Sequence, residues 1–485
     1  MRSPWIIGLF VIAFAVVVYY FTTTGSDGQQ DDVAERLRQR QMRESVGSAV
    51  VENDVVADEP DWAALEAAGK GVPVPKVLDV RPGEGGMFWF VGYPGEPFGI
   101  EIPFGAGRFR TPPAEQEPVH ENPGFLGANV CAECHQEKHD SFIHTAHHRT
   151  SRLPETEAFG GSFEEGKNVL STKSPQVAFK MVERDGKFYQ RVSYYGWQFE
   201  VPMDIIVGSG KLGESYLYWH EDGLYQANVS YAETADGWIN SPGYLDGDAN
   251  YSRSIGSRCV ECHFTYADSR GEGNQFTESS FILGVSCERC HGTGEKHVEF
   301  HRQNKDEKKG QHISVPTQLS RQGQLDLCGQ CHSTVTPAKG EPFAFQPGDR
   351  FEDRFEAPDP NEAGNSVHTS NQVARLSLSK CFQETEMACA DCHDPHKHER
   401  GNKRLFSERC MKCHEVSECG MNDQPVDGLD LAANCVDCHV PVKESERMRM
   451  ELGSESVFPP LRDHFIRVDR AATKEYLQSL KTVPQ

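Results

Sequence analysis

The longest hydrophobic segment of the chain is an uninterrupted apolar run of 17 residues at positions 5–21, WIIGLFVIAFAVVVYYF. A helix needs about 17–25 such residues to cross a bilayer. Arg2 precedes the run, and no convincing small-residue cleavage site follows it. The pattern therefore predicts an uncleaved transmembrane signal anchor over residues 1–22, followed by a polar stalk over residues 23–75.

Two later regions alternate aromatic or β-branched residues with polar ones, which is the period of a half-buried strand. The first region, residues 76–118, has Gly and Pro at its turns and predicts a small β module. The second region, residues 160–250, contains strand-like runs on both sides of Asp185-Gly186 and Asp222-Gly223. Because Asp-Gly favours a tight hairpin turn, we expect a β-hairpin insertion there.

The rest of the chain is dominated by one repeated unit, Cys-x-x-Cys-His, which occurs seven times and uses fourteen of the 16 cysteines. In a helical turn, positions i, i+3 and i+4 share one face. Two sulfurs can then bond to the vinyl groups at a porphyrin edge while the adjacent imidazole reaches the iron, and this unit is the attachment site of c-type haem. The predicted haem-binding cysteines are Cys131, Cys134, Cys259, Cys262, Cys287, Cys290, Cys328, Cys331, Cys389, Cys392, Cys410, Cys413, Cys435 and Cys438. The predicted proximal ligands are His135, His263, His291, His332, His393, His414 and His439.

Zinc and disulfide readings explain this repeat less well. A zinc ribbon groups four cysteines around one ion and needs no histidine after every pair, and a disulfide scaffold has no use for that histidine either. We therefore expect seven covalently bound haem c groups. From residue 259 onward the first cysteines of successive motifs are 28, 41, 61, 21 and 25 residues apart, which leaves room for a helix or two per haem.

These spacings predict the organisation of the remaining chain. We expect a multihaem cytochrome c domain over residues 119–450, mainly α with much irregular structure around stacked haems. Its core would be largely porphyrin, since only 37% of the residues are hydrophobic. A C-terminal tail over residues 451–485 would follow.

Thirteen of the 20 histidines lie outside the motifs, so each iron could have a second histidine ligand. His396 lies three residues after His393, a reach of at most about 10 Å, and His297 lies six residues after His291, a reach of about 20 Å. Neither span is long enough for the chain to pass around the porphyrin of the preceding motif and reach its opposite face. We therefore expect His396 and His297 each to ligate a neighbouring haem, and His297 to ligate the next one along the chain. The distal candidates are His147, His297, His312, His368, His396 and His464, with His144 and His220 in reserve.

The formal net charge of −23, the pI near 5.3 and the mean hydropathy of −0.57 describe an acidic, polar body. Nucleic acid is excluded as a partner because phosphate binding needs clustered Lys and Arg. We expect redox partner proteins or membrane quinol-linked electron donors as the partners of this acidic body. The sequence leaves the oligomeric state open. Four arginines between positions 36 and 43 would place the body in the cytoplasm. Haem attachment takes place outside the cytoplasm, however, so we expect the periplasmic side of the bacterial inner membrane with a single-pass N-terminal anchor.

Two cysteines, Cys381 and Cys419, fall outside the motifs. In an oxidising compartment we expect them to form a disulfide. It would close a loop of about 38 residues and contribute about 3–4 kcal/mol on the chain-entropy estimate. Two unrelated thiols are the alternative.

The motifs and their surroundings resemble the multihaem cytochromes c of the cytochrome c-554 type, over residues from about 120 to 445. GFLGANVCAECHQEKHDSFIHTAHH is similar to that family's opening haem site, where a histidine in a Ser-x-x-x-Thr-Ala-His context is a distal ligand. The resemblance implies this role for His147. SCERCHGTGEKH and CADCHDPH are similar to the family's paired sites, which implies distal roles for His297 and His396.

The chain also departs from that family. IVGSGKLGESYL is similar to a segment before the second haem site of larger bacterial members, but Lys211 and Leu212 stand where relatives often carry a histidine. Pentahaem nitrite reductases and octahaem hydroxylamine-oxidising proteins differ in haem count, and no Cys-x-x-Cys-Lys motif is present in this sequence.

The sequence therefore predicts a membrane-anchored periplasmic heptahaem cytochrome c that transfers electrons along closely packed, mostly bis-histidine haems. No catalytic residue is assigned, and an electron carrier is favoured over a substrate-converting enzyme. The alternative is a multihaem oxidoreductase that acts on a small nitrogen or sulfur compound at one five-coordinate haem.

Overall fold

The structure is a computed structural model that describes most of the chain from residue 123 onward and a few elements before it. Most of the predicted N-terminal region, including the apolar run at 5–21, lies outside the described residues. Within the described part of the chain, no helix is long and apolar enough to cross a membrane. The described residues are 60–69, 80–82, 88–91, 99–102 and 123–482, apart from gaps at 156–157, 221, 250, 252, 271–272, 360–365, 424–425 and 427.

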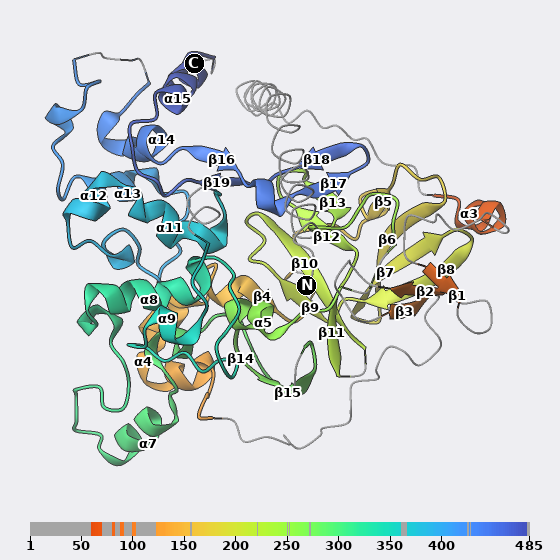
Figure 1. Ribbon diagram of the computed structural model, residues 1–485, viewed down its shortest axis with the longest axis horizontal. Coiled ribbons are helices and arrows are strands. Elements are labelled where there is room, and N and C mark those ends of the chain that lie inside the picture. Colours follow the sequence, from red (N-terminus) through yellow and green to blue (C-terminus); the bar gives the residue numbers. More distant parts are fainter. Residues whose placement is uncertain are drawn as a thin grey trace, which may run out of the picture.

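Antiparallel sheets build one half of the molecule, at the centre and right of Figure 1. The largest is an eight-stranded sheet with the order β18-β17-β13-β12-β10-β9-β4, in which β11 also pairs with β10. Its strands are β4 (Ser151–Arg152), β9 (Ile205–Val207), β10 (Gly213–His220), β11 (Gly223–Gln226), β12 (Val229–Ala232), β13 (Gly237–Asn240), β17 (Met450–Leu452) and β18 (Glu455–Val457).

Four smaller sheets accompany it, with the orders β5-β6-β7-β8, β1-β2-β3, β14-β15 and β16-β19. The first is a meander of β5 (Val169–Ser171), β6 (Val177–Arg184), β7 (Lys187–Tyr194) and β8 (Trp197–Pro202). The others are formed by β1 (Val80–Pro82), β2 (Phe88–Val91) and β3 (Gly99–Ile102), by β14 (Phe264–Ser269) and β15 (Phe276–Leu283), and by β16 (Val442–Glu444) and β19 (Pro460–Arg462).

The hairpins expected at Asp-Gly dipeptides are present. Strands β6 and β7 pair down to Arg184↔Lys187, so Asp185 and Gly186 form the two-residue turn. Both have positive φ, 54° and 70°, as a type I′ turn requires. Strands β10 and β11 pair down to His220↔Gly223 and form the second hairpin.

Most of the motif turns lie in a second half made of short helices, at the left of Figure 1, with α5 close to the sheets. The helices of this half are α4 (Ala128–Phe142), α5 (Ser257–His263), α6 (Glu288–His291), α7 (Glu295–Gln303), α8 (Arg321–His332), α9 (Phe351–Arg354), α11 (Gln372–Ser377), α12 (Lys380–Glu384), α13 (Lys403–Cys410), α14 (Cys435–His439) and α15 (Arg470–Thr482). Helix α3 (Trp62–Gly69) lies apart from them, beside β7 and β8 at the right of Figure 1. Single 3-10 turns are η2 (His148–Thr150), η4 (Pro316–Gln318), η5 (Thr369–Asn371), η6 (Cys389–Asp391), η7 (Val416–Glu418), η8 (Leu431–Ala433) and η9 (Glu446–Met448).

The main apolar core lies between the meander and the large sheet. Phe179 of β6 and Tyr216 and Tyr218 of β10 are fully buried in it. The Gln190 side chain crosses from β7 to β12, where its amide donates to the Val229 carbonyl (2.7 Å) and accepts from the Val229 N–H (3.0 Å). This exchange satisfies both backbone groups of Val229 and links the two sheets.

The prediction of a mainly α chain is wrong, because the structure is organised around several antiparallel sheets. The sheets also reach beyond the predicted insertion: β17 and β18, after the last motif, extend the eight-stranded sheet through the pair Asn240↔Glu451. Strands of three residues are too short to show the alternation that identifies a strand from sequence. The predicted transmembrane part of that fold class falls on residues that the structure does not describe.

Candidate haem-binding centre

Each of the seven motifs forms one helical turn that ends at its histidine. Five lie on α4, α5, α6, α8 and α14. In the fifth motif the His393 N–H donates to the Cys389 carbonyl at 3.0 Å, and in the sixth the His414 N–H donates to the Cys410 carbonyl at 3.1 Å. These i+4 bonds bring the two sulfurs and the imidazole to one side of each turn.

The chain turns sharply after the third motif. Gly292 ends α6 with a φ of +82°, a left-handed conformation that glycine adopts without strain. Helix α7 starts at Glu295, three residues further on. The turn directs the His297 ring away from its own motif, and it faces His135 of the first motif instead.

Four motif histidines each face a histidine from elsewhere in the chain. Two metal–nitrogen bonds of about 2.0 Å, with each nitrogen about 1.1 Å from its ring centre, separate the ring centres of an axial imidazole pair by about 6.2 Å. The four pairs match this separation, and the residues present therefore fit an iron between the rings. The ring centres lie 6.4 Å apart for His135 and His297, 6.2 Å for His332 and His147, 6.1 Å for His291 and His396, and 6.0 Å for His393 and His464.

Hydrogen bonds donated by Nδ1–H orient several of these rings. An Nδ1–H donated to a carbonyl leaves Nε2 as the unprotonated nitrogen that binds a metal. The Nδ1 contacts to carbonyl oxygens are His291 to Ser314 (2.8 Å), His332 to Thr369 (2.7 Å), His297 to Gln311 (2.7 Å), His439 to Arg467 (3.1 Å) and His464 to Arg462 (3.2 Å). His396 differs, since its Nδ1 lies 3.2 Å from a carboxylate oxygen of Asp394.

Burial favours the neutral, metal-binding form of several imidazoles. It lowers the pKa of His263 and of His464. It also lowers the pKa of His291, with nearby histidines adding to the effect. A histidine must be neutral to coordinate a metal. These buried environments therefore suit metal-binding histidines better than they suit protonated ones.

Thiols from different motifs meet at three places, so the attachment points of the motifs concerned lie side by side. The contacts join the first motif to the third, the second to the fourth and the fourth to the fifth. The contacting thiols are Cys131 and Cys287, Cys262 and Cys331, and Cys328 and Cys389.

The other three motif histidines are His263, His414 and His439. Among the residues that the structure describes, none of them has a histidine ring opposite it at the separation of the four pairs. His263 is held differently from His291, His332 and His439, because its Nδ1 contacts the Thr150 hydroxyl and not a carbonyl oxygen, at 2.8 Å. A hydroxyl can donate or accept, whereas a carbonyl can only accept.

The remaining distal candidates are not brought to a motif histidine. The His144 side chain is exposed. His220 lies beside Tyr225, with 6.2 Å between ring centres, and His312 packs against Phe300. His368 Nδ1 contacts the hydroxyl of the nearby Ser370 at 2.7 Å. The structure thus brings His147, His297, His396 and His464 to motif histidines, and it does not do so for His312, His368, His144 or His220.

His297 faces the first motif rather than the next one along the chain, contrary to the sequence expectation. The turn at Gly292 folds α7 back toward α4. The disulfide prediction also fails, because Cys381 and Cys419 are both free. They lie beside different motifs: Cys381 interacts electrostatically with Cys392 and Cys410, and Cys419 with Cys438.

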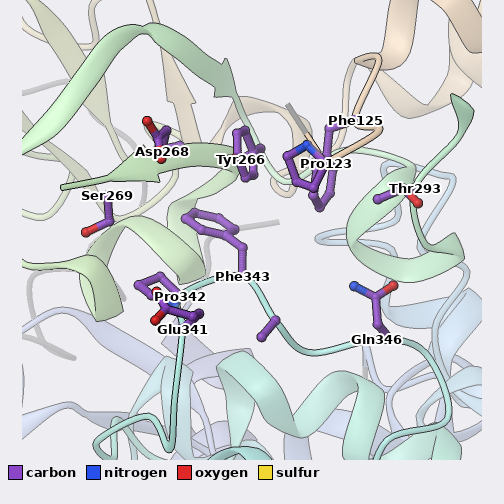
Figure 2. Close-up of a pocket in the computed structure, with 12 residues that line it drawn as sticks. Pro123, Phe125, Tyr266, Asp268, Ser269, Thr293, Glu341, Pro342, Phe343 and Gln346 are labelled. Carbon is purple, nitrogen blue, oxygen red and sulfur yellow. The ribbon is translucent and has the colours of Figure 1, made fainter. Parts of the chain in front are cut away.

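A cavity of 410 Å³ lies between β14, the segment before α4 and the loop after α8. Figure 2 shows Phe125, Tyr266 and Phe343 on its wall, with Asp268 and Glu341 at its edge. Phe125 stacks on Tyr266 with 4.9 Å between ring centres. The cavity adjoins the second and third motifs, because Tyr266 lies three residues after His263 and the lining residue Thr293 lies two residues after His291.

The family described as cytochrome c554 and c-prime matches residues 224–292, which include the second and third motifs. The chain is thus similar to multihaem c-type cytochromes, and its motifs together with this match support haem c as its cofactor.

A curated relative is the dissimilatory sulfite reductase MccA of Wolinella succinogenes, 22% identical over 370 residues, or 65% of this chain and 47% of that protein. The chain thus spans about half the length of this relative. Among solved structures, the outer cell wall cytochrome OcwA is similar with a TM-score of 0.44 and 16% identity, over 72% of this chain and 81% of OcwA.

Sequence reasoning missed the variable residues inside the motifs. Glu288, the first variable residue of the third motif, is 3% exposed, and its carboxylate accepts the backbone N–H groups of Leu126, Gly127 and Gly294 at 2.8–3.0 Å. The third motif thereby holds the segment that begins α4. For the second variable position of the motifs, a signal was available in the sequence, because the residue there is polar in every motif. These residues are Glu133, Glu261, Arg289, Gln330, Asp391, Lys412 and Asp437.

Proposed function

We propose that the protein is a heptahaem cytochrome c that passes electrons along a row of mostly bis-histidine haems. The observation that carries this proposal is the set of four imidazole pairs whose separation fits an iron. The bound haem supplies a one-electron centre, while the protein's ligands, hydrogen bonds and burial set its potential. We assign as axial pairs His135 with His297, His332 with His147, His291 with His396, and His393 with His464.

Cross-ligation supports a connected row. His297 follows the third motif but faces the first, and His396 follows the fifth motif but faces the third. Each such histidine fixes one iron position relative to the turn of another motif. With the thiol contacts, these links support a row through the first, third and fifth motifs, with the fourth beside the fifth and the second beside the fourth.

The test combines a haem count with a ligand variant. The mass of the mature protein and its pyridine haemochrome spectrum should both give seven haems per chain. His396→Ala should convert one haem from low-spin to high-spin in the electron paramagnetic resonance spectrum. His398→Ala, in the same loop and exposed, is the matched control and should leave the spectrum unchanged. An unmodified polypeptide mass, or identical spectra for the two variants, would contradict the proposal.

A second candidate is a multihaem oxidoreductase that acts at the haem of His263. It is favoured by the lack of an imidazole facing His263 among the described residues and by the hydroxyl contact from Thr150. The name of the Wolinella relative favours a small sulfur oxyanion such as sulfite as the substrate, ahead of a nitrogen compound. In this case Thr150 and the motif turn of α5 would hold the ring, and the opposite side would be open to the substrate.

Spectroscopy distinguishes the two candidates. An enzyme should show a high-spin ferric signal in the resting protein that shifts when sulfite is added, and reduced methyl viologen should be oxidised when sulfite is present. A carrier should show neither effect. Thr150→Val removes the hydroxyl at nearly constant size, and it should alter the high-spin signal only if the His263 haem is the responsive one.

We further propose a location at the periplasmic side of the inner membrane, with attachment through the apolar run at 5–21 and redox proteins or quinol-linked donors as partners. The support is the run itself, the acidic charge and the need to attach haem outside the cytoplasm. Cell fractionation tests it: replacing residues 1–22 with a cleavable signal should move the haem-loaded protein from the membrane to the soluble periplasmic fraction. Cytoplasmic recovery of the native haem protein would rule it out.

A further inference from the structure

The second variable residues of the second, third and fourth motifs meet in the interior. Glu261, Arg289 and Gln330 are only 2%, 5% and 4% exposed. Arg289 Nη2 donates to Gln330 Oε1 at 2.6 Å and to the Glu261 carbonyl at 3.2 Å. Gln330 Nε2 donates back to the Arg289 carbonyl at 3.3 Å. Three haem-binding turns are therefore tied together by side chains from within their own motifs.

This cluster carries an excess of positive charge. The Glu261 carboxylate is paired with Arg258 at 2.7 Å and accepts the Phe343 N–H at 2.8 Å. Arg289 forms no ion pair with a carboxylate among the described residues, and its guanidinium lies 5.1 Å from the centre of the Phe343 ring. Its Nε is buried without a hydrogen-bond partner there. A buried charge without a counter-ion is costly, so its presence beside three haem-binding turns indicates an electrostatic role.

The neighbouring residue has the opposite charge and faces another pair of motifs. Glu288 is buried and acts electrostatically on the thiols of Cys131 and Cys287, in the first and third motifs. Arg289 acts on Cys290 and on Cys331 of the fourth motif. Arg258 adds to the positive side, since it acts on Cys331 and on Cys262 of the second motif. Two consecutive residues thus place a negative charge at one edge of the third motif and a positive charge at the other.

We propose that Glu288 and Arg289 are positioning residues that create an electrostatic gradient across the third motif and direct electrons from the first motif toward the second and fourth. The proposal rests on the proposed function. A positive charge stabilises an added electron and a negative charge opposes it. The haem that His135 would hold on the side of Glu288 would supply one electron, and the haems that His263 and His332 would hold on the side of Arg289 would accept it, with no proton or other reactant. The gradient makes the first motif the entry point and the second motif the exit, and each has an exposed cysteine, Cys134 and Cys259.

The test is a pair of substitutions at one position in the full-length, haem-loaded protein. Arg289→Gln removes the charge but keeps a donor for Gln330, whereas Arg289→Lys keeps the charge. A unit charge about 10 Å away at an effective dielectric constant of about 20 changes the electron partition about tenfold, which is 59 mV for a one-electron couple. In a spectroelectrochemical titration, the reduction potential of the higher-potential haems should fall by about this amount in Arg289→Gln. It should change little in Arg289→Lys.

Other variants keep the proposal falsifiable. Glu288→Gln should raise the potential of the lower-potential haems, the opposite direction to Arg289→Gln. Arg302→Gln removes an exposed arginine paired with Glu133 and should shift nothing, because solvent screens it. Equal shifts in Arg289→Gln and Arg289→Lys would mean a purely structural role and overturn the gradient, as would unshifted potentials in both Arg289→Gln and Glu288→Gln. Failure of the proposed function would be visible separately, in the haem count and spin state of the unmodified protein.

Discussion

The two halves of the molecule are stabilised by different means. The sheet half has a continuous core of 20 buried residues, including Phe179, Tyr216 and Tyr218. The apolar clusters of the helical half have only three buried members each, such as Leu325, Leu376 and Phe382. Short helices with so little core do not hold together by themselves. The comparison indicates that the sheet half folds as an ordinary protein, while the helical half needs its porphyrins as core.

Buried charge occurs in both halves, and in the sheet half Arg152 is paired with the buried Glu214. In the helical half, Arg375 and Asp463 form a pair of hydrogen bonds at 2.8 Å with side-chain exposures of 10% and 0%. The Arg289 cluster lies there as well. Haem potentials depend on such nearby charges and hydrogen bonds, so polar interiors that would only weaken an ordinary domain have a use beside redox centres.

The largest expected effect comes from withholding haem. Full-length chain produced without haem attachment should lose the helical half completely, because its core would be missing, while the sheet half keeps its own core. Limited proteolysis with mass spectrometry should then cleave first within residues 287–439 and late within residues 169–240. The haem-loaded protein is the control and should resist cleavage in both ranges. Equal protection of the two ranges without haem would refute the division.

Core truncation in the sheet half is the second test. Phe179 is fully buried, and Phe179→Ala should cost about 3–5 kcal/mol of unfolding free energy. Urea unfolding followed by tryptophan fluorescence measures this loss, and the haem spectrum should remain that of the parent protein. Leu153→Ala, at a side chain 61% exposed, is the control and should stay within about 0.5 kcal/mol. Altered haem ligation in Phe179→Ala would show that the halves depend on each other.

A smaller effect is expected from Asp204 in the sheet half. Burial raises the pKa of this carboxyl to about 6, although it accepts the Trp219 N–H at 2.9 Å. The folded state therefore binds a proton more tightly than the unfolded state, and stability falls as pH rises from about 4 to about 6. Above pH 6, the unfolding free energy of Asp204→Asn should exceed that of the parent protein by about 1–3 kcal/mol. Below pH 6, the stability of the variant should vary less with pH than that of the parent. Unfolding of both proteins between pH 4 and 7 tests this, and a parallel pair of profiles would contradict it.

How far the sequence predicts the structure also differs between the halves. Motif turns follow from local spacing, as do the hairpin at Asp185-Gly186 and the reach argument that separates His396 from His393. Which imidazole faces which motif depends on long-range packing. The pairing of His464 with His393, 71 residues apart, is an example. The joining of β17 to β13 through Asn240↔Glu451 has no local signal, because three-residue strands show no readable period.

The smallest expected effect concerns Cys381 and Cys419, where sequence and structure disagree. A disulfide between them would stabilise the helical half by about 3–4 kcal/mol, whereas two free thiols beside different motifs contribute only their packing. Cys419→Ser should therefore change the unfolding free energy of the haem-loaded protein by less than about 1 kcal/mol, and Cys381→Ser should behave alike. Thiol labelling of the denatured protein should find two reactive groups per chain, since the proposed function has all fourteen motif cysteines bonded to haem. A loss of about 3–4 kcal/mol of unfolding free energy, with no thiol labelled, would contradict this prediction. It would show that a disulfide, together with the porphyrins, stabilises the helical half.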